Sequence, residues 1–519
     1  MGDRRWWLAG GFGLLLVAWT MGSPLIGAPD ETAHYYKALG AAHGEWTGSA
    51  VAPVTTGMDT RDRFLTLMSR YFRLDPAYAV QTGEPGERLE CPTFKPGPAA
   101  CQYHTVGLPP VRTPVVIPGV WDGPAPTGPP PISGLLPSYV GSYPPFVYLP
   151  MGLAARLTGG GTPGLRVARA ASALVCLGLL VGAVRCSRQG AAAVGLLLAA
   201  TPMTFFLAGS ITTSGMEIAA GLCAFAAAFA IVGGAREREP WLWFGVGGSV
   251  LAASRVLGPV WAAYLVAVPC ALLGRHGLLV LWRSHRRRMV GAGAVLLVSA
   301  GATALWDVLA VPRVHAGPGA VRGALGPAVR HLPGLARQGV GVFGWIDTPM
   351  PRAAYALALL AMSVVGVLAL WVGTRRQRLV LAGTAITALV ATVAVEAFTQ
   401  TPYGFVSQGR YTLAVAVATP LLSAHILVER GARAPALLLG AALAGAALVA
   451  SLLQVTGWYA QAHHYSVGLA GPRNFLAAPA WSPPGGWAPW VLCAVAGSAM
   501  LAYAGWLSVR PSLSRSGRA

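Results

Sequence analysis

Two carboxylates and an imidazole fall within five residues just after the first apolar segment, in Pro29-Asp30-Glu31-Thr32-Ala33-His34. If a helix begins here, Asp30 and His34 are four residues apart and Glu31 and His34 three, so the side chains project to neighbouring positions. A carboxylate can act as general base on a hydroxyl, and a second acid or an imidazole can tune its pKa or share a divalent metal. We predict that Asp30, Glu31 and His34 are catalytic, with Asp30 as the base and Glu31 and His34 either orienting it or joining it in holding a divalent metal, Mg²⁺ or Mn²⁺. The alternative is a plain helix start, where proline and acidic residues are favoured.

The composition indicates that a membrane positions this cluster. The chain has 519 residues, of which 54% are hydrophobic and 11% charged, and its mean hydropathy is +0.55. Long apolar runs recur along the chain, which predicts an all-α polytopic membrane protein. The net charge of +20 does not point to nucleic acid. Most arginines lie in short loops between apolar segments, as the positive-inside rule describes.

About twelve transmembrane helices are expected, since a span needs roughly 20 apolar residues. The candidate segments are 6–25, 164–184, 191–211, 215–234, 241–254, 257–274, 289–311, 353–373, 379–398, 411–428, 436–457 and 488–507. The arginine distribution places both termini in the cytoplasm. The predicted regions are a first helix at 1–25, an extracytoplasmic loop at 26–163, a bundle at 164–311, a second outer loop at 312–352 and a C-terminal bundle at 353–519.

The first outer loop carries ten of the eighteen acidic residues. Its start, 30–43, has few helix breakers and is expected to be helical. Its end is an apolar stretch to residue 157 that is too short to span, which predicts an interfacial or re-entrant helix. Cys91 and Cys101 lie in this loop, and an extracytoplasmic location favours a disulfide between them over two free thiols.

Several charged residues near the outer ends of predicted spans are candidates for substrate contacts. Arg410 can grip a lipid phosphate with two hydrogen bonds, with Gln408 and Tyr411 beside it, unless it only reaches lipid head groups. Charges inside spans are costly, at about 2.5–3.5 kcal/mol each, and are usually functional or paired. Those in or at the edges of spans are Glu217, Arg255, Asp307 and Glu396. We predict that Glu217 and Arg255 line the site; the alternative is a structural ion-pair network.

A second outer motif, Gly344-Trp345-Ile346-Asp347-Thr348, combines an aromatic ring with an acid. Trp345 offers a flat surface for a sugar ring and Asp347 can bind hydroxyls, although Trp345 could equally belong to the interfacial aromatic belt. His463 and His464 are far in sequence from any carboxylate, so no metal role is expected for them.

The acidic motif resembles the "PDE-x-x-H" signature of the domain-of-unknown-function 2142 family of bacterial integral membrane proteins, which is common in actinobacteria. Other stretches resemble the family in the same order, and the first of them adds Tyr143 to the predicted substrate-binding residues. They are Ser142-Tyr143-Pro144-Pro145-Phe146-Val147-Tyr148, Thr201-Pro202-Met203, Ser214-Gly215-Met216-Glu217, Phe343-Gly344-Trp345-Ile346-Asp347-Thr348 and Ser407-Gln408-Gly409-Arg410-Tyr411. The resemblance implies a GT-C-like fold, as in polyprenyl-phosphate-sugar-dependent glycosyltransferases, with Asp30 and Glu31 in the acidic catalytic motif.

The expected function is transfer of a sugar from a polyprenyl-phosphate donor to a lipid or polysaccharide acceptor of the cell envelope, in a site that faces outside. The chain contains no P-loop and no dinucleotide-binding glycine motif. A second hypothesis is a transporter or flippase of a lipid-linked polymer that uses Glu217, Asp307 and Glu396 as a charged path. A third is a non-catalytic scaffold for envelope assembly.

Overall fold

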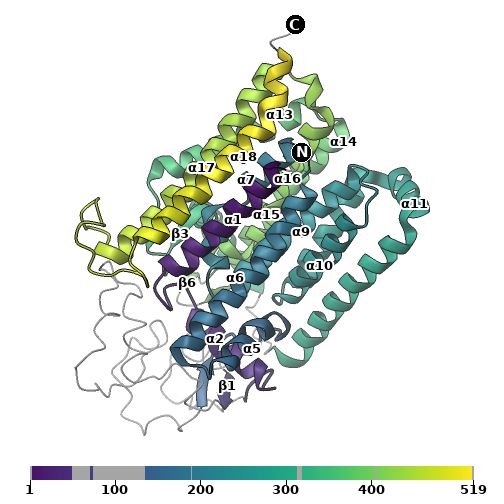
Figure 1. Cartoon of the computed structure of the whole chain (residues 1–519). Helices are drawn as coiled ribbons and strands as arrows, with labels where there is room; N and C mark the ends of the chain where they lie inside the picture. The colour runs from purple at the N-terminus through teal and green to yellow at the C-terminus, as the bar shows by residue number, and fades with distance from the viewer. Residues whose placement is uncertain are drawn as a thin grey trace.

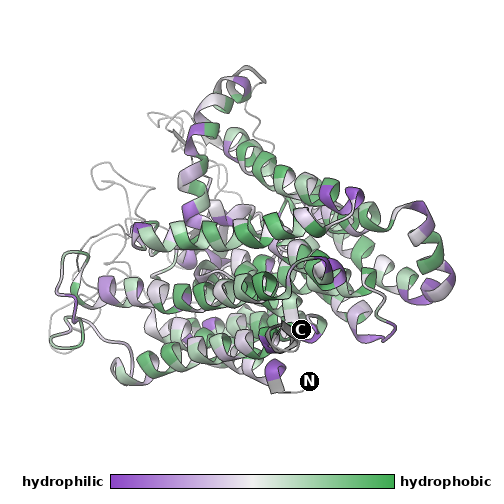
Figure 2. Cartoon of the chain, turned by 90° about the horizontal axis from the view of Figure 1, so that it is seen from above, coloured by the Kyte–Doolittle hydropathy of each residue, from purple (hydrophilic) through white to green (hydrophobic). Residues whose placement is uncertain are grey.

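The computed structural model describes residues 3–49, 70–73, 97, 135–188, 190–311, 318–401, 404–405 and 407–516. Cys91 and Cys101, predicted to form a disulfide, lie outside the described residues. Within these ranges the protein is a bundle of long helices with three short two-stranded sheets. Hydrophobic residues run along the helices, and hydrophilic ones gather mainly at helix ends and turns (Figure 2).

The first part of the bundle is built from helices that lead into and out of the first loop. They are α1 (Asp3–Gly22), α2 (Glu31–Ala42), η2 (Phe146–Tyr148), α5 (Leu149–Leu157), α6 (Gly161–Cys186), α7 (Gly190–Ala199), α8 (Pro202–Ala208), α9 (Thr213–Val232), α10 (Glu239–Ala253) and α11 (Gly258–Ala310). Strands β1 (Arg70–Arg73) and β2 (Leu135–Ser138) pair antiparallel beside α2. The expected helix after Pro29 and the short apolar helix ending at residue 157 are both present.

The second part consists of α12 (Pro318–Gly341), α13 (Arg352–Val372), α14 (Arg375–Phe398), η3 (Gly409–Tyr411), α15 (Leu413–Ala416), α16 (Ala418–Arg430), η4 (Gly431–Arg433), α17 (Ala436–Val467) and α18 (Ala488–Ser516). Strands β3 (Val342–Phe343) and β4 (Thr348–Pro349) form a hairpin, as do β5 (Gln400–Thr401) and β6 (Gly404–Phe405). Figure 1 shows α2, α5 and β1 at one end of the bundle and both termini toward the other.

Among the described residues, eight helices are long and apolar enough to cross a membrane, or nine if α7 and α8, bent by 66°, form one span. This confirms an all-α polytopic membrane protein, but the count differs from the twelve expected. Arg4 and Arg5 reduce the apolar character of α1, and α10 has only 15 residues. α11 joins two predicted spans in one element of 53 residues that turns back through non-helical Gly274 and His285.

Packing around α2 fixes the first acidic motif against the bundle. Gly152 of α5 lies so close to α2 that an added Cβ would sit 1.9 Å from the carbonyl oxygen of Ala38. Lys37, which is fully buried, donates hydrogen bonds to the carbonyl oxygens of Gly141, at 2.6 Å, and Trp46. Its ammonium also lies over the Phe72 ring. The start of α2 is therefore held from several sides.

Candidate functional site

Asp30 sits at the junction between the chain leaving α1 and the first turn of α2. It is the N-cap of α2, with a left-handed backbone at φ 66° and ψ 7°. Its Oδ2 accepts a hydrogen bond from Arg410 Nη2 at 2.6 Å, and its Oδ1 accepts one from the Tyr139 hydroxyl. Residues 380 positions apart in the chain thus meet in one ion pair.

Arg410 has hydrogen-bonding capacity that Asp30 does not use. Its side chain is 3% exposed, and its Nε and Nη1 are buried without a hydrogen-bond partner among the described residues. Buried donors are almost always satisfied in native proteins, so two unsatisfied N–H groups on one guanidinium indicate a place for an anionic or polar ligand. Arg410 also lines a hollow of about 10 Å³, together with Pro29, Gln338, Ile346 and Gln408.

A second guanidinium lies beside the first. Arg255, in the break between α10 and α11, stacks its guanidinium 4.3 Å from the ring centre of Tyr411 and 5.7 Å from that of Tyr143. Its Nε donates to Thr213 Oγ1 at 3.1 Å, and Glu217 Oε2 lies 3.8 Å away. The predicted residues Arg410, Tyr411, Arg255, Glu217 and Tyr143 therefore share one region with Asp30.

His34 faces the same region from the next turn of α2. Its Nδ1 lies 2.6 Å from the Tyr148 hydroxyl, and its ring stacks on Tyr148 and meets the edge of Tyr143. Burial lowers the pKa of His34 to about 3 despite the opposing charge of Asp30, so the imidazole is neutral at physiological pH. A neutral His34 orients neighbouring hydroxyl groups and adds no charge to the site.

The Asp30 carboxylate is ionised. Burial raises its pKa, but the charge of Arg410 and the hydrogen bonds from Tyr139 and Arg410 outweigh burial, and the pKa lies below its ordinary value. Burial and the neighbouring Asp30 charge together raise the pKa of Tyr139 well above its ordinary value, so its hydroxyl stays protonated and donates to Asp30.

Glu31 does not join Asp30 in this region. Its carboxylate is fully buried and receives Arg169 Nε at 2.6 Å and Nη2 at 2.5 Å, together with the Ile211 amide at 3.0 Å. Arg169, on α6, also donates to the carbonyl oxygens of Ser23 and Pro24. Glu31 is thus occupied in a structural ion pair that ties α2 to α6 and to the loop before α9.

No group of three or more His, Cys, Asp or Glu side chains in the described ranges is arranged to hold a metal ion. The metal site predicted from Asp30, Glu31 and His34 is therefore not formed in this structure. The reason is geometric: the Glu31 carboxylate turns to Arg169, while the Asp30 carboxylate is held by Arg410 and Tyr139.

The β3–β4 hairpin carries the second predicted motif. Trp345 Nε1 donates to the Ile26 carbonyl oxygen at 3.2 Å, and Ile346, with φ 68°, lines the hollow at Arg410. Asp347 Oδ1 accepts from Thr348 Oγ1 at 2.9 Å and lies 3.9 Å from His464 Nδ1. The expectation that His464 is remote from carboxylates is wrong, because the hairpin brings Asp347 to the end of α17.

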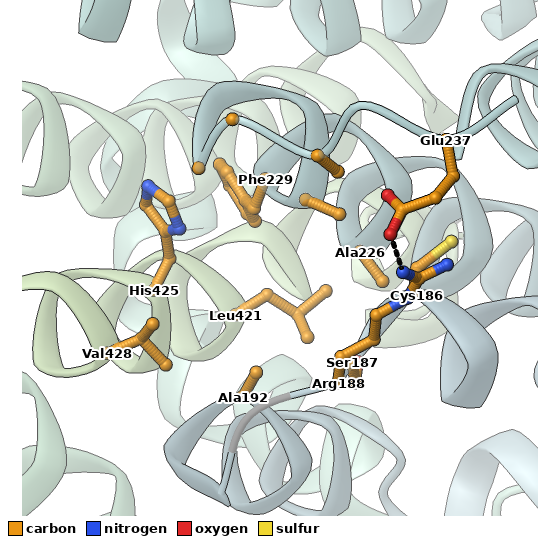
Figure 3. A pocket seen from close by; sticks show the side chains of 14 residues that line it. Cys186, Ser187, Arg188, Ala192, Ala226, Phe229, Glu237, Leu421, His425 and Val428 are labelled. Carbon is orange, nitrogen blue, oxygen red and sulfur yellow. Dashed lines mark hydrogen bonds and ion pairs between the residues drawn. The ribbon is translucent and has the colours of Figure 1, made fainter. Parts of the chain in front are cut away.

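A larger cavity, of about 230 Å³, lies elsewhere in the described part of the chain. Phe229, His425 and Arg188 surround it, and Arg188 is paired with Glu237 (Figure 3). Phe229 is sixteen residues along α9 from Thr213, or about 24 Å at 1.5 Å per residue. The polar groups that line this cavity already have partners, since Arg188 also pairs with Glu239 and His425 lies beside Glu429. The candidate site is therefore the Asp30–Arg410 region, although its hollow is small.

Sequence reasoning missed two contributors to this region, Tyr139 and Tyr148, and it missed Arg169, the partner of Glu31. Tyr148 lay in a quoted motif without a role, and Tyr139 gave no signal. Arg169 did give one, because an arginine in a predicted span needs an acidic partner.

A family model described as a predicted membrane protein, DUF2142, matches residues 136–419, which is more than half of the chain. The chain belongs to this family. The matched range includes Tyr139, Tyr143, Arg255 and Arg410, while Asp30 precedes it.

No curated protein matches the chain. One solved structure does, the crystal structure of ArnT from Cupriavidus metallidurans bound to undecaprenyl phosphate. It is 18% identical, the match covers 72% of this chain and 68% of that one, and the TM-score is 0.34. A TM-score this low supports no conclusion about the site of this DUF2142 protein.

Proposed function

We propose that this DUF2142 protein is a GT-C-like glycosyltransferase that moves a sugar from a polyprenyl-phosphate donor to an acceptor in the outer leaflet or cell envelope. The observation that carries the proposal is the Arg410 guanidinium. It is buried, it holds Asp30 with one nitrogen, and its other two nitrogens have no partner among the described residues. A phosphate is the ligand that best matches such a fork of N–H donors.

In the proposed reaction, Asp30 takes the proton from an acceptor hydroxyl as that oxygen attacks the anomeric carbon of the donor sugar. The bond between the anomeric carbon and the phosphate oxygen breaks, and its electron pair leaves with the polyprenyl phosphate. Arg410 stabilises the leaving phosphate, and Arg255 adds a second positive charge beside Tyr411. Attack from the face opposite the phosphate inverts the anomeric centre.

The Asp30–Arg410 pair links the basicity of Asp30 to the binding of the donor. While Arg410 donates to Asp30, the guanidinium lowers the pKa of the carboxylate and makes Asp30 a weak base. A donor phosphate that draws Arg410 toward itself would remove that effect and raise the basicity of Asp30. The base would then strengthen only when donor is bound.

The transporter hypothesis predicts charges spread across the depth of the membrane. Glu217 instead lies in the first turns of α9 beside Arg255, and Asp307 follows Trp306, whose indole donates to the Ser142 carbonyl near the site. Glu396, close to the end of α14, pairs with His331 at 2.9 Å. Charges gathered at one end of the bundle favour transfer at a membrane surface over passage through it.

The proposed orientation puts this end outside and both termini in the cytoplasm, since the arginine-rich turns lie toward the terminal end. Reporter fusions after residue 519 and inside the 312–317 segment would give opposite locations; the same location would refute the orientation.

The function is tested with purified protein in proteoliposomes and a panel of radiolabelled polyprenyl-phosphate sugars. D30N should abolish transfer in protein that still folds and unfolds cooperatively, and R410Q should raise the donor KM and weaken binding of unglycosylated polyprenyl phosphate at least tenfold. D307N is the matched control, because it removes an acid from the same end and should retain transfer. Full transfer activity of D30N, or loss of transfer in D307N alone, would contradict the assignment of Asp30 as the base.

A further inference from the structure

Helix α12 presents three different faces. One is buried: Ala324, Ala328 and Leu335 recur at four and seven residues and are at most 5% exposed. Ala324 and Ala328 pack with Ala397 of α14. This face attaches α12 to the bundle.

The second face is apolar but uncovered. Leu325 is 44% exposed and Val329 is 53% exposed, and both lie one position after a buried alanine. At 100° per residue this stripe is turned by about a quarter of the helix circumference from the buried face. In a polytopic membrane protein, exposed branched side chains on one stripe of a helix are expected to contact lipid acyl chains.

The third face is basic. Arg322, Arg330 and Arg337 are all exposed, recur at eight and seven residues, and extend over about 22 Å along the helix. α12 contains no Asp or Glu, and none of these arginines forms an ion pair with a described residue. Arginines beside an apolar stripe are the pattern of helices that lie in the membrane interface and bind anionic lipids.

The last turn of α12 reaches the candidate site. Gln338 Oε1 accepts a hydrogen bond from the Gly409 amide at 2.8 Å, and an added Cβ on Gly409 would lie 2.0 Å from the Leu335 carbonyl oxygen. Gln338 and Arg410 line the same small hollow. The last turn of α12, which also carries Arg337, therefore lies next to the buried guanidinium of Arg410, which has two unsatisfied donors.

We propose that α12 lies in the membrane interface as a binding surface for anionic lipids, with Leu325 and Val329 among the acyl chains and the three arginines on lipid phosphates. We further infer that this surface leads a phosphate-bearing lipid toward Arg410; this second step rests on the proposed function. The occupant is a lipid and not a protein, because the apolar and basic faces adjoin along the helix and no acidic residue interrupts them.

The position of α12 is tested by nitroxide labels on L325C and V329C, made in a full-length protein whose native cysteines are replaced by alanine. In vesicles of phosphatidylcholine and phosphatidylglycerol, both labels should relax with oxygen and resist a water-soluble nickel chelate. A label on R330C should show the reverse balance. Labels at 325 and 329 that are open to nickel, or hidden from both reagents as in a protein interface, would overturn the proposal.

The lipid preference is tested by native mass spectrometry of protein extracted from the same vesicles. R322Q/R330Q/R337Q should lower the ratio of retained phosphatidylglycerol to phosphatidylcholine, by about fivefold for each arginine that contacts a phosphate. R283Q/R286Q/R287Q removes the same charge from an exposed part of α11 and is the matched control. An equal loss in both triple variants would refute a specific surface. If R322Q/R330Q/R337Q loses the lipid preference but keeps the wild-type donor KM in the transfer assay, the delivery step is refuted and the lipid-binding surface remains.

Discussion

The buried ion pair between Glu31 and Arg169 allows a direct test of whether Glu31 is structural while the adjacent Asp30 is catalytic. Both side chains are at most 2% exposed, and the guanidinium donates twice to the carboxylate. Removing one partner of such a pair costs about 3–5 kcal/mol, because a charge stays buried without compensation. We therefore expect E31Q and R169M each to lower the free energy of unfolding by that amount.

R169M should be the more damaging change. Arg169 also donates to the carbonyl oxygens of Ser23 and Pro24, and each lost hydrogen bond to a charged donor adds about 1.5–3 kcal/mol. In the double variant neither charge remains, so its destabilisation should fall short of the sum of the single effects by at least about 2 kcal/mol. Denaturant unfolding in detergent micelles, followed by circular dichroism, measures all three.

The matched control is E237Q, which breaks a surface pair between Glu237, 53% exposed, and Arg188, 29% exposed. This change should lower stability far less than E31Q, because solvent screens exposed ion pairs. If E31Q costs no more than E237Q, the structural role of Glu31 is refuted. If E31Q is stable but inactive, the sequence-based assignment of Glu31 as a catalytic residue is the better one.

Two further predictions concern the packing of α2. Burial lowers the pKa of Lys37 from 10.5 in the unfolded chain to about 7 in the folded protein. Between these two pH values the unfolded chain binds a proton that the folded protein does not, so the stability of the folded protein should rise as the pH increases from about 7 to 10. The melting temperature should show this rise in the wild type, and K37M should flatten it. A flat wild-type profile would contradict this reasoning. G152A should destabilise the protein by about 1–3 kcal/mol, because the added Cβ would collide with the Ala38 carbonyl. G178A is the control, since a Cβ at Gly178 would have no atom within 4 Å and should not destabilise the protein. Equal melting temperatures for the two variants would show that α2 and α5 are not packed this closely.

Much of the architecture could be predicted because hydropathy and arginine placement are local signals. The start of α2 after Pro29 and the break at Arg255 between α10 and α11 both follow from the residues themselves. The number of spans was harder, since the α11 hairpin is continuous helix except at Gly274 and His285. Hydropathy marks apolar length but does not show how many times a helix reverses.

Side-chain partners depend on tertiary contacts that spacing does not encode. Spacing placed Asp30, Glu31 and His34 on neighbouring positions, but the left-handed backbone at Asp30 separates its carboxylate from that of Glu31, and each meets a different arginine. The same limit explains His464, which only the β3–β4 hairpin brings to Asp347.

The backbone of Asp30 yields a final prediction that separates conformational strain from chemistry. Left-handed φ costs most residues about 1–2 kcal/mol, whereas Gly avoids this cost and Asn tolerates it. D30G, D30N and D30A all remove the partner of Arg410, so their stabilities should differ mainly by strain, with D30A about 1 kcal/mol below the other two. Differential scanning fluorimetry in detergent measures this order, and the proteoliposome assay measures transfer. All three should be inactive if the carboxylate is the base. Activity that follows the order of stability would mean that Asp30 shapes the turn and performs no chemistry.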